Sequence, residues 1–583
     1  MRVKTTNTSN GKLFYIIKTY YDTKGIEHTL TVEKLGKEHD IRQRTGTDPM
    51  QWARERAKIL TQKEKEENKD ISLAFSPSSL ITKHYQYSFN VGYLFLQKIF
   101  HELKLDQICD AIQAGSKVTF PLRDILAKLC YGRILYPSSK QATFHFSKTL
   151  LQQPQFEEHH VYRALDILAE QFDSIQASLY KNSFALGKRN TKILYYDCTN
   201  FFFETEEPDS NGLRAYGKGK ENRPLPLVEM GLFIDQDGIP LAMSIHPGNT
   251  NEQVTLTPLE KTLLQDFKLS KFVVCTDAGL SSHANKRFNS LSDRAFLTTQ
   301  SLKKLKKEFR ETALNPTQWY RMGAKRTDKK YDLRDLDEKQ EFDSVFYKEI
   351  PVDHKDFYER LIVTYSMKYS AYLQSIRNGQ IARAEKALQS GGVRLKKNAN
   401  DFRRFIRKDN YTKEGELAEK ARQYIDTDVI AAEAQYDGFY ALSTNLIDED
   451  PSQIVAVNHQ RWQIEQCFRI MKSEFQSRPA YVWTDAHIKA HFLTCFLSLV
   501  LYKYLEKRLN NHYSCEKITE TLRSMQVREV VGEGYLPTYT RTNLTDDLHE
   551  SFGFRTDYQI ITKDTMKKIK AASKKRKQYA KKA

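Results

Sequence analysis

Three acidic residues, Asp197, Asp277 and Glu465, stand where carboxylates could gather around metal ions. Asp197 follows the apolar segment "KILYY" and Asp277 follows "SKFVVCT", so we expect each aspartate to end a buried strand. Two magnesium ions about 4 Å apart, held by such carboxylates, activate a water or a hydroxyl and stabilise the leaving oxygen in phosphodiester chemistry. Manganese could substitute, since it also prefers oxygen ligands. Taken singly, an aspartate after a strand is more often a turn former.

The segment around Glu465, "NHQRWQIEQCFRIMKSEF", predicts a helix with two distinct faces. At about 100° per residue, Arg461 lies at about −40° and Lys472 at about −20° from Glu465, so one carboxylate stands between two cations. The opposite side carries the apolar residues Ile464, Cys467, Ile470 and Met471, which predicts that this side packs on the core. Taken alone, the polar face is more often an exposed face with an ordinary ion pair between Arg461 and Glu465.

The elements that must position these residues begin at residue 191, where strand patterns replace helical ones. We expect a strand that ends at Asp197 and a second strand up to residue 204. The order then predicted is two strands around an Asp237-Gly238 turn, a helix over 251–267, and a strand over 271–276. A long segment, 301–435, interrupts this pattern and is predicted to be helical and irregular, before a strand at 436–446 and long helices. The pattern indicates a mixed α/β sheet with acidic residues at strand ends.

The N-terminal part of the chain divides into two regions. Residues 1–75 predict strands followed by a charged helix that starts at Asp48-Pro49. Residues 76–188 are largely helical, and two helices on either side of the break "YPSS" have the outline of a helix-turn-helix. In that interpretation Ser138 or Ser139 caps the second helix, and Lys140 and Gln141 face outward toward DNA. Many helical pairs share this outline without binding DNA.

Charge is the strongest compositional signal in this 583-residue chain. Lys and Arg number 91 against 73 Asp and Glu, which gives a net charge of +18 and a pI of about 9.2. Three segments, 303–330, 394–409 and 563–583, carry net charges of +7, +5 and +9, so the rest of the chain is nearly neutral. Separate basic segments on a neutral chain predict contact with nucleic-acid phosphates. A single basic run, such as the C-terminal one, is as often only a solvated tail.

Several classes of protein are excluded by composition. The seven cysteines are scattered without a CxxC pair, which excludes a disulfide scaffold and a zinc site of usual spacing and fits a reducing cytosol. The N-terminus lacks the apolar segment of a secretory signal. The longest apolar run, near residues 492–502, is shorter than the ~18–20 residues of a membrane span. We therefore expect a buried core helix there, no membrane partner and a cytoplasmic location.

Taken together, these residues resemble a DDE-type insertion-sequence transposase of the subgroup with the signature Tyr-(2)-Arg-(3)-Glu-(6)-Lys. Arg461, Glu465 and Lys472 have this spacing, whereas Asn458 stands at the position of the signature's Tyr. The order of the three carboxylates and the basic segment before Glu465 also match. The resemblance covers residues 80–510 and implies an α/β fold, with an RNase H-like catalytic core, an inserted basic domain and a preceding, mainly helical DNA-binding region.

The domain organisation that follows has six parts. They are a small N-terminal β plus helix module (1–75), a helical, helix-turn-helix-like DNA-binding region (76–188), the first part of the RNase H-like core (189–300), the basic insertion domain (301–435), the second part of the core with the Glu helix (436–510), and a C-terminal region with a basic tail (511–583).

The resemblance also implies roles for the central residues. Asp197, Asp277 and Glu465 would bind two Mg²⁺ ions, and Arg461 and Lys472 would hold phosphates at the cleaved element end. Relatives cut DNA at terminal inverted repeats and join the ends to a target, often through a DNA hairpin. The implied partners are double-stranded DNA at the element ends and target, and a second copy of the chain, because pairing two ends needs at least a homodimer. The implied location is the nucleoid of a prokaryotic cytoplasm.

Four further residues could contact DNA, although each also has an ordinary structural explanation. Hairpin-forming relatives hold a flipped base on an aromatic ring, and Trp319 is the candidate here, although a Trp in such a segment is more often a packing anchor. Lys218 and Arg223 lie in the loop "YGKGKENRP" near Asp197 and could touch DNA, but loop cations are usually just solvated. Asn249 could orient the strand end, although an Asn after Pro-Gly is first a turn residue.

Two other functions remain open on the sequence. One is an RNase H-like nuclease or resolvase that only hydrolyses, and the other is a catalytically inactive or repurposed transposase that binds DNA. The basic insertion and the Arg-Glu-Lys helix favour a transposase over the first. The presence of all three carboxylates favours it over the second.

Overall fold

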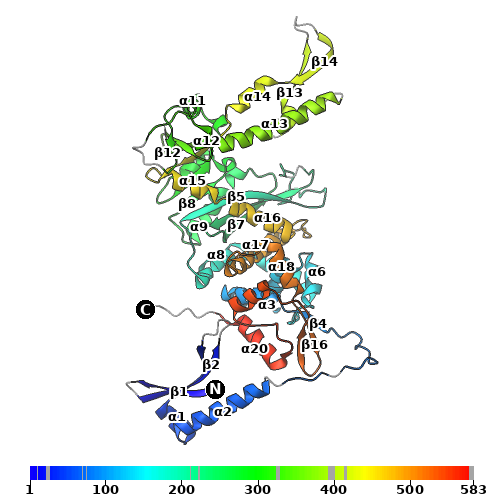
Figure 1. The fold of residues 1–583 in the computed structure, drawn as a ribbon. Helices are drawn as coiled ribbons and strands as arrows, with labels where there is room; N and C mark the ends of the chain where they lie inside the picture. Colours follow the sequence, from blue (N-terminus) through cyan, green and yellow to red (C-terminus); the bar gives the residue numbers. More distant parts are fainter. Residues whose placement is uncertain are drawn as a thin grey trace. The chain divides into compact units, whose positions relative to one another are not determined.

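The computed structural model describes residues 1–583 with short gaps, and the chain divides into two compact units (Figure 1). The gaps are residues 9–10, 22–26, 68–69, 74, 210–211, 221–222, 324–328, 391–400, 412–416 and 577–583. The first unit comprises Met1–Tyr87 with Val531–Gly534 and Thr562–Asp564, and the second comprises Ser88–Val530, Tyr535–Ile561 and Thr565–Ala583. Parts of all three basic segments therefore lie outside the described residues.

The N-terminal unit contains a three-stranded antiparallel sheet, ordered β1-β2-β3, and two helices. Its elements are β1 (Arg2–Thr8), β2 (Gly11–Tyr21), β3 (Glu27–Lys37), α1 (Glu38–Thr45) and α2 (Pro49–Glu67). Asp48 accepts a hydrogen bond from the backbone N–H of Gln51 at 2.8 Å, so it caps α2 at the predicted start. Phe14, Ile16 and Ile41 are buried between sheet and helices.

A helical region precedes the large sheet of the second unit. It comprises α3 (Tyr93–Glu102), α4 (Leu105–Ala114), α5 (Leu122–Leu135), α6 (Lys140–Ser147), α7 (Glu158–Glu170) and α8 (Phe172–Ser183). Ser139 caps α6 by accepting a hydrogen bond from Ala142 N at 3.1 Å. A Cβ added at Gly132 of α5 would lie 2.5 Å from Thr143 Cγ2, so the two helices pack very closely.

This close packing contradicts one prediction about α6. Gln141 is exposed as expected, but Lys140 is only 3% exposed and points into the helical core. Burial, aided by the nearby charge of Arg133, lowers the pKa of Lys140 to about 7. The expectation that Lys140 faces outward toward DNA was therefore wrong, because the helix pair buries the side of α6 that carries it.

The second unit is built on a nine-stranded mixed sheet, ordered β10-β11-β12-β15-β9-β8-β5-β6-β7. The first five of these strands in chain order are β5 (Ile193–Phe202), β6 (Leu227–Asp235), β7 (Pro240–Pro247), β8 (Val273–Thr276) and β9 (Ala295–Thr299). β5, β6 and β7 form an antiparallel meander, while β8 runs parallel to β5 and β9 parallel to β8. This is the RNase H-like arrangement, so the predicted α/β fold class is confirmed.

Helices cover both faces of this sheet (Figure 1). Side chains alternate along β5, so that Leu194, Tyr196 and Cys198 pack in one core with α8 and with α9 (Leu256–Gln265). Tyr195 and Phe201 face the opposite core, which contains α17 (Asp485–Arg508). Each fully buried apolar side chain contributes about 1.5–3 kcal/mol, so the two cores fix the sheet firmly.

Strand β5 differs from the prediction. It runs unbroken from Ile193 to Phe202, and Asp197 lies in its middle, not at its end. Every residue from Leu194 to Phe202 pairs with a residue of β6, so the polar residues at 197, 199 and 200 do not interrupt the ladder. The two short strands expected there are one strand because tertiary pairing overrides the local break in apolar pattern.

The basic segment after Asp277 adds strands to the same sheet. β10 (Tyr320–Arg321), β11 (Phe346–Asp353), β12 (Tyr358–Tyr365) and β15 (Phe439–Thr444) extend it beyond β9. The helical and irregular structure predicted for 301–435 was thus wrong for β10, β11 and β12, whereas β15 agrees with the strand predicted at 436–446. The remaining elements are α10 (His283–Asn289), α11 (Lys307–Leu314), α12 (Glu338–Glu341), α13 (Met367–Gln389), β13 (Ile406–Tyr411), β14 (Leu417–Ile425) and α14 (Thr427–Ala434).

The C-terminal helices include the predicted buried core helix. α17 is long and apolar enough to span a membrane by length and composition, but 94% of its apolar window is buried inside the protein. It packs against α3, α5 and α7, which confirms a buried core helix. The other elements are β4 (Ser88–Asn90), α15 (Pro451–His459), α16 (Trp462–Arg469), α18 (Cys515–Ser524), β16 (Gln526–Val530), β17 (Gly534–Pro537), α19 (Asn543–Phe552), β18 (Ile561–Thr562) and α20 (Lys563–Lys574).

Candidate active site

The parallel pairing of β5 with β8 brings Asp197 and Asp277 together. Tyr195 is paired with Cys275, so continuing the register by two residues places Asp197 opposite Asp277. Neighbouring strands lie about 4.8 Å apart, which leaves the two carboxylates within reach of a shared ion. The sheet therefore juxtaposes the two aspartates that the sequence singled out.

The pKa of Asp197 is affected by its burial and also by the charge of Asp277, as expected for two neighbouring carboxylates. Burial raises the pKa of the Asp197 carboxyl to about 6, the charge of Asp277 adds to the rise, and Lys220 opposes it. Asp277 accepts hydrogen bonds from Gly279 N at 2.9 Å and Leu280 N at 3.2 Å, both through Oδ1. No donor among the described residues pairs with Asp277 Oδ2, so this oxygen is available to a cation.

Helix α16 lies over the face of the sheet that carries Asp197. Arg461 Nη1 donates to Thr299 Oγ1 of β9 at 3.3 Å, and Lys472 Nζ donates to Thr199 Oγ1 of β5 at 2.7 Å. Thr199 follows Asp197 by two residues and so shares its face. Glu465 lies on the helix between these two anchors and is exposed. The two cations of the predicted face therefore contact the sheet, while Ile464, Cys467 and Met471 are buried as predicted.

The helix departs from regular geometry around Lys472. Residues Ile470–Glu474 form a π-helical turn, which is wider than an α-helical one. Such turns often mark functional positions, because they redirect the side chains that follow. The simple 100° arithmetic therefore gives the right face for Lys472 but not its detailed direction.

A polar chain that sequence reasoning missed supports Arg461. Asn458 Nδ2 donates to the Tyr440 hydroxyl at 3.1 Å, and that hydroxyl lies 2.8 Å from Thr299 Oγ1, which in turn accepts from Arg461. Asn458 stands where the signature has Tyr, and here it contacts a tyrosine from β15. No local pattern reveals this chain, since its members come from four elements.

A second acidic pair was also missed. Glu229 on β6 is 3% exposed, and burial together with the charge of Glu252 raises its pKa to about 8. Lys220 Nζ lies 3.9 Å from Glu252 Oε1 and donates to Cys198 O at 2.5 Å. Burial lowers the pKa of Lys220, but the carboxylates, with Asp197 foremost, raise it overall. A charged residue inside the apolar strand "LVEMGLF" was the one available sequence signal.

The transposase DDE domain family matches residues 201–501, just over half of the 583-residue chain. The chain belongs to this family. The matched range contains Asp277, Glu465 and both helix cations and begins just after Asp197. A cryo-EM structure of the piggyBac transposase synaptic complex with hairpin DNA is similar at 11% identity and a TM-score of 0.32, over 74% of this chain and 78% of that chain. No curated protein sequence matches the chain.

The prediction of a DDE-type transposase is thereby confirmed at the level of the family, while the subgroup signature stays a prediction. For this transposase the structure overturns one candidate contact. Trp319 is fully buried, and its Nε1 donates to Asn315 O at 2.8 Å. The ring packs against Tyr365 and Phe439. Trp319 is a packing anchor and cannot stack on a flipped base, because no part of the ring reaches the surface.

The loop residues expected to touch DNA lie near the transposase's acidic residues. Lys218 and Asn249 are exposed and line one cavity of about 480 Å³ together with Lys220 and Glu229. The Arg223 guanidinium lies 4.4 Å from the centre of the Phe202 ring, at the end of β5. Their placement is compatible with DNA contact, and that role stays a prediction.

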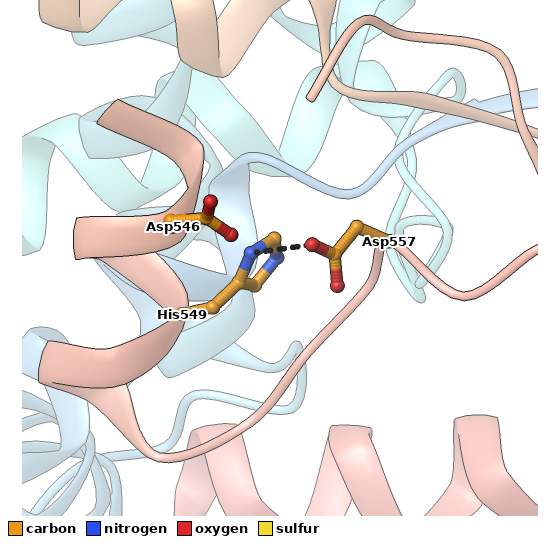
Figure 2. A group of neighbouring side chains, drawn as sticks. All are labelled: Asp546, His549 and Asp557. Carbon is orange, nitrogen blue, oxygen red and sulfur yellow. Dashed lines mark ion pairs between the residues drawn. The ribbon is translucent and has the colours of Figure 1, made fainter. Parts of the chain in front are cut away.

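Another group of metal-ligand types, Asp546, His549 and Asp557, lies outside the sheet (Figure 2). Thr556 N donates to His549 Nε2 at 3.1 Å, so the neutral ring carries its proton on Nδ1, which faces Asp557 Oδ2 at 3.5 Å. Arg555 Nη2 lies 2.6 Å from Asp546 Oδ1 and 2.7 Å from Asp557 Oδ2. The ring nitrogen that faces Asp557 carries a proton, and both carboxylates are paired with Arg555. We therefore interpret this group as a structural ion-pair cluster and not as a metal site.

Proposed function

We propose that this transposase binds the terminal inverted repeats of an insertion sequence, cleaves the element ends and joins them to target DNA. The observation that carries the proposal is the meeting of Asp197 and Asp277 beneath the helix that presents Glu465 between two cations. Hydrolysis frees the element end, and transesterification joins its 3′ hydroxyl to a target phosphate. Both reactions use the same site.

The residues present fit divalent metal ions, which the family generally uses. Asp197, Asp277 and Glu465 offer the carboxylate oxygens that magnesium prefers, and few enough of them to leave room for phosphate oxygens. The raised pKa of Asp197 reports a buried negative charge next to another, which a cation would relieve. When bound, two Mg²⁺ or Mn²⁺ ions would activate the attacking oxygen and stabilise the leaving one.

The two cations beside Glu465 would bind the scissile phosphate. Arg461 and Lys472 flank Glu465, and each is held by a threonine of the sheet. Their charges are thus fixed beside the carboxylates, where the scissile phosphate would lie. Arginine binds phosphate through two parallel N–H groups and orients it, whereas lysine acts as a point charge.

Cations on other parts of the surface would bind the backbone of double-stranded DNA. Lys303, Lys304, Lys306 and Lys307 are exposed on the segment that follows β9. Lys218 and Arg223 add charge near the end of β5. Clustered cations give binding that is strong, sequence-tolerant and sensitive to salt. Two copies of the chain would act on two element ends, in the cytoplasm at the nucleoid.

The test uses a labelled DNA end, taken from the DNA that flanks the reading frame, incubated with full-length protein and Mg²⁺. Wild-type protein is expected to nick the end and to form strand-transfer products. Asp197→Asn should bind the end without cutting it. Asp293→Asn, a change of an exposed aspartate in the turn before β9, should behave as wild type. Equal behaviour of wild type and Asp197→Asn would contradict the proposal.

A further inference from the structure

Glu229 is a buried carboxylate without a hydrogen-bond partner for one of its oxygens. It lies on β6, where every residue from Leu227 to Asp235 is buried, and Oε1 makes no hydrogen bond within the described residues. An ionised carboxylate in such a place is costly unless a cation compensates it. The side chain lines the cavity of about 480 Å³ at the base of the Lys218–Lys220 loop.

Glu252 brings a second carboxylate to the same cavity. It begins the short helix Glu252–Val254 that precedes α9. A Cβ built on Gly279 would lie 3.6 Å from Glu252 Oε2 and 3.2 Å from Asp277 Oδ1, so the two carboxylates flank one point of the backbone. Asn249 and Thr250 line the cavity as well. The cavity therefore offers several oxygen donors of the kind that magnesium and manganese prefer.

The Glu229 side chain points to the opposite face of the sheet from Asp197. Glu229 is paired with Asn200, and directly opposed residues of an antiparallel pair share a face. Asn200 is an odd number of residues from Asp197 along β5, so Glu229 points away from the face covered by α16. Geometry thus separates Glu229 from Glu465, which lies on the helix over the other face.

Lys220 lines the cavity, and its ammonium is attracted by Asp197, Glu252 and Glu229. Its ammonium lies 3.9 Å from Glu252 Oε1. The side chain is 46% exposed, so the ammonium can move out of the cavity into solvent. One ammonium beside two carboxylates leaves a negative surplus. A divalent ion would balance that surplus and would free the Lys220 charge for a DNA phosphate.

We propose that Glu229 and Glu252 form a separate binding site for a divalent cation of the magnesium and manganese class, in which the Lys220 ammonium stands when no metal is bound. The site adjoins Asp277 but does not include Glu465. The proposal does not depend on DNA cleavage, because it concerns binding by the protein alone.

Titration of the full-length, DNA-free protein with Mn²⁺, read by electron paramagnetic resonance and calorimetry, tests the proposal. The double variant Asp197→Asn/Asp277→Asn should keep one class of bound Mn²⁺, and adding Glu229→Gln to it should remove that class. Glu260→Gln is the matched control, since Glu260 is also fully buried with one unpartnered oxygen but lies on α9 away from the cavity. It should leave Mn²⁺ binding unchanged.

Thermal unfolding gives a second readout. Mn²⁺ should raise the Tm of the double variant, and Glu229→Gln should abolish this rise. If Glu229→Gln fails to fold, the less buried Glu252→Gln should show the same loss of binding. Equal Mn²⁺ stoichiometry with and without both glutamates, or no Mn²⁺ bound by the double variant, would overturn the separate site. Neither result would bear on cleavage at Asp197 and Asp277.

Discussion

Asp197, in the middle of β5, lies near Asp277, which directly follows the neighbouring parallel strand β8, although the two residues are far apart in the chain. Burial is the main cause of the raised pKa of Asp197, and repulsion from the charge of Asp277 adds to it. Folding therefore keeps two like charges close together, an arrangement that a bound cation would stabilise. The arrangement makes the pair more informative than either residue alone.

Asp277→Asn should abolish cleavage and preserve DNA binding. The substitution removes a ligand charge while keeping the shape and the hydrogen bonds to Gly279 and Leu280. Replacing residues that merely support ligands costs about 10–100-fold, so loss of a ligand itself should exceed about 100-fold. Cleavage of a labelled end and anisotropy of the same DNA measure the two properties. Loss of binding along with cleavage would argue against a pure metal role.

Tyr440→Phe should slow cleavage about 10-fold by loosening Arg461, in line with other supporting residues. The change removes the hydroxyl that joins Asn458 to Thr299 and leaves the ring in place. DNA affinity should change little, because the exposed lysines remain. Tyr436→Phe, a nearby change outside this chain of contacts, serves as the control. An unchanged cleavage rate in Tyr440→Phe would show that the chain does not position Arg461.

Lys140→Met should stabilise the protein most below pH 7. Burial lowers the pKa of Lys140 to about 7, whereas an unfolded lysine titrates near about 10.4. The unfolded chain therefore binds more protons between these values, so wild-type stability rises as the pH increases from about 7 to 10. Lys140→Met lacks this gain, and its advantage, on the order of a few kcal/mol, should shrink over that window.

Chemical denaturation at pH 6, 8 and 10 (roughly spanning the window) measures the effect of Lys140→Met. Lys117→Met changes an exposed lysine and should show no such pH dependence. DNA binding by Lys140→Met should equal that of wild type, since the buried ammonium cannot reach a phosphate. A difference in stability that does not vary with pH would contradict the assignment of a buried, titrating ammonium.

The sequence predicts the parts of this fold that local signals specify. The Asp237-Gly238 hairpin, the strand before Asp277 and the buried helix α17 are each marked by turn chemistry or an apolar run. The continuity of β5 through Asp197 is not so marked, because pairing with β6 decides it. Strands β11 and β12 were missed for a related reason: they lie in a charged segment and gain their partners only in the sheet.

In the candidate site, too, local features could be predicted from the sequence and tertiary contacts could not. Glu465 and its flanking cations follow from helical periodicity, which is local. Glu229 and Glu252 become neighbours only when β6 and the start of α9 meet, so spacing along the chain cannot pair them. The outward direction assigned to Lys140 failed because the packing of α5 on α6 buries that side of the helix.

Trp319→Ala should destabilise the protein without a direct effect on DNA contact. Removing a fully buried Trp typically costs about 3–5 kcal/mol, and here it also leaves Asn315 O without its donor. Trp483→Ala is the matched control, since that ring is 59% exposed. It should change the free energy of unfolding by no more than about 1 kcal/mol. Similar unfolding free energies for the two variants would contradict the packing role of Trp319.

Removal of the C-terminal basic segment should weaken DNA binding on all sequences alike, but the structure limits how much can be deleted. Met566 and Ile569 of α20 are buried in the core, and Arg576 pairs with Asp106. Deleting residues 563–583 would therefore disturb folding, whereas deleting 577–583 removes Lys577, Lys581 and Lys582 without touching these contacts.

The shorter deletion should lower the slope of log affinity against log salt by up to about 0.9 for each lysine that contacts a phosphate. Affinity for an element end and for unrelated DNA of equal length should fall by the same factor, because phosphate contacts carry no sequence information. Anisotropy titrations over a range of salt concentrations measure both quantities. A loss confined to the element end would show that these lysines contribute to recognition of the inverted repeat.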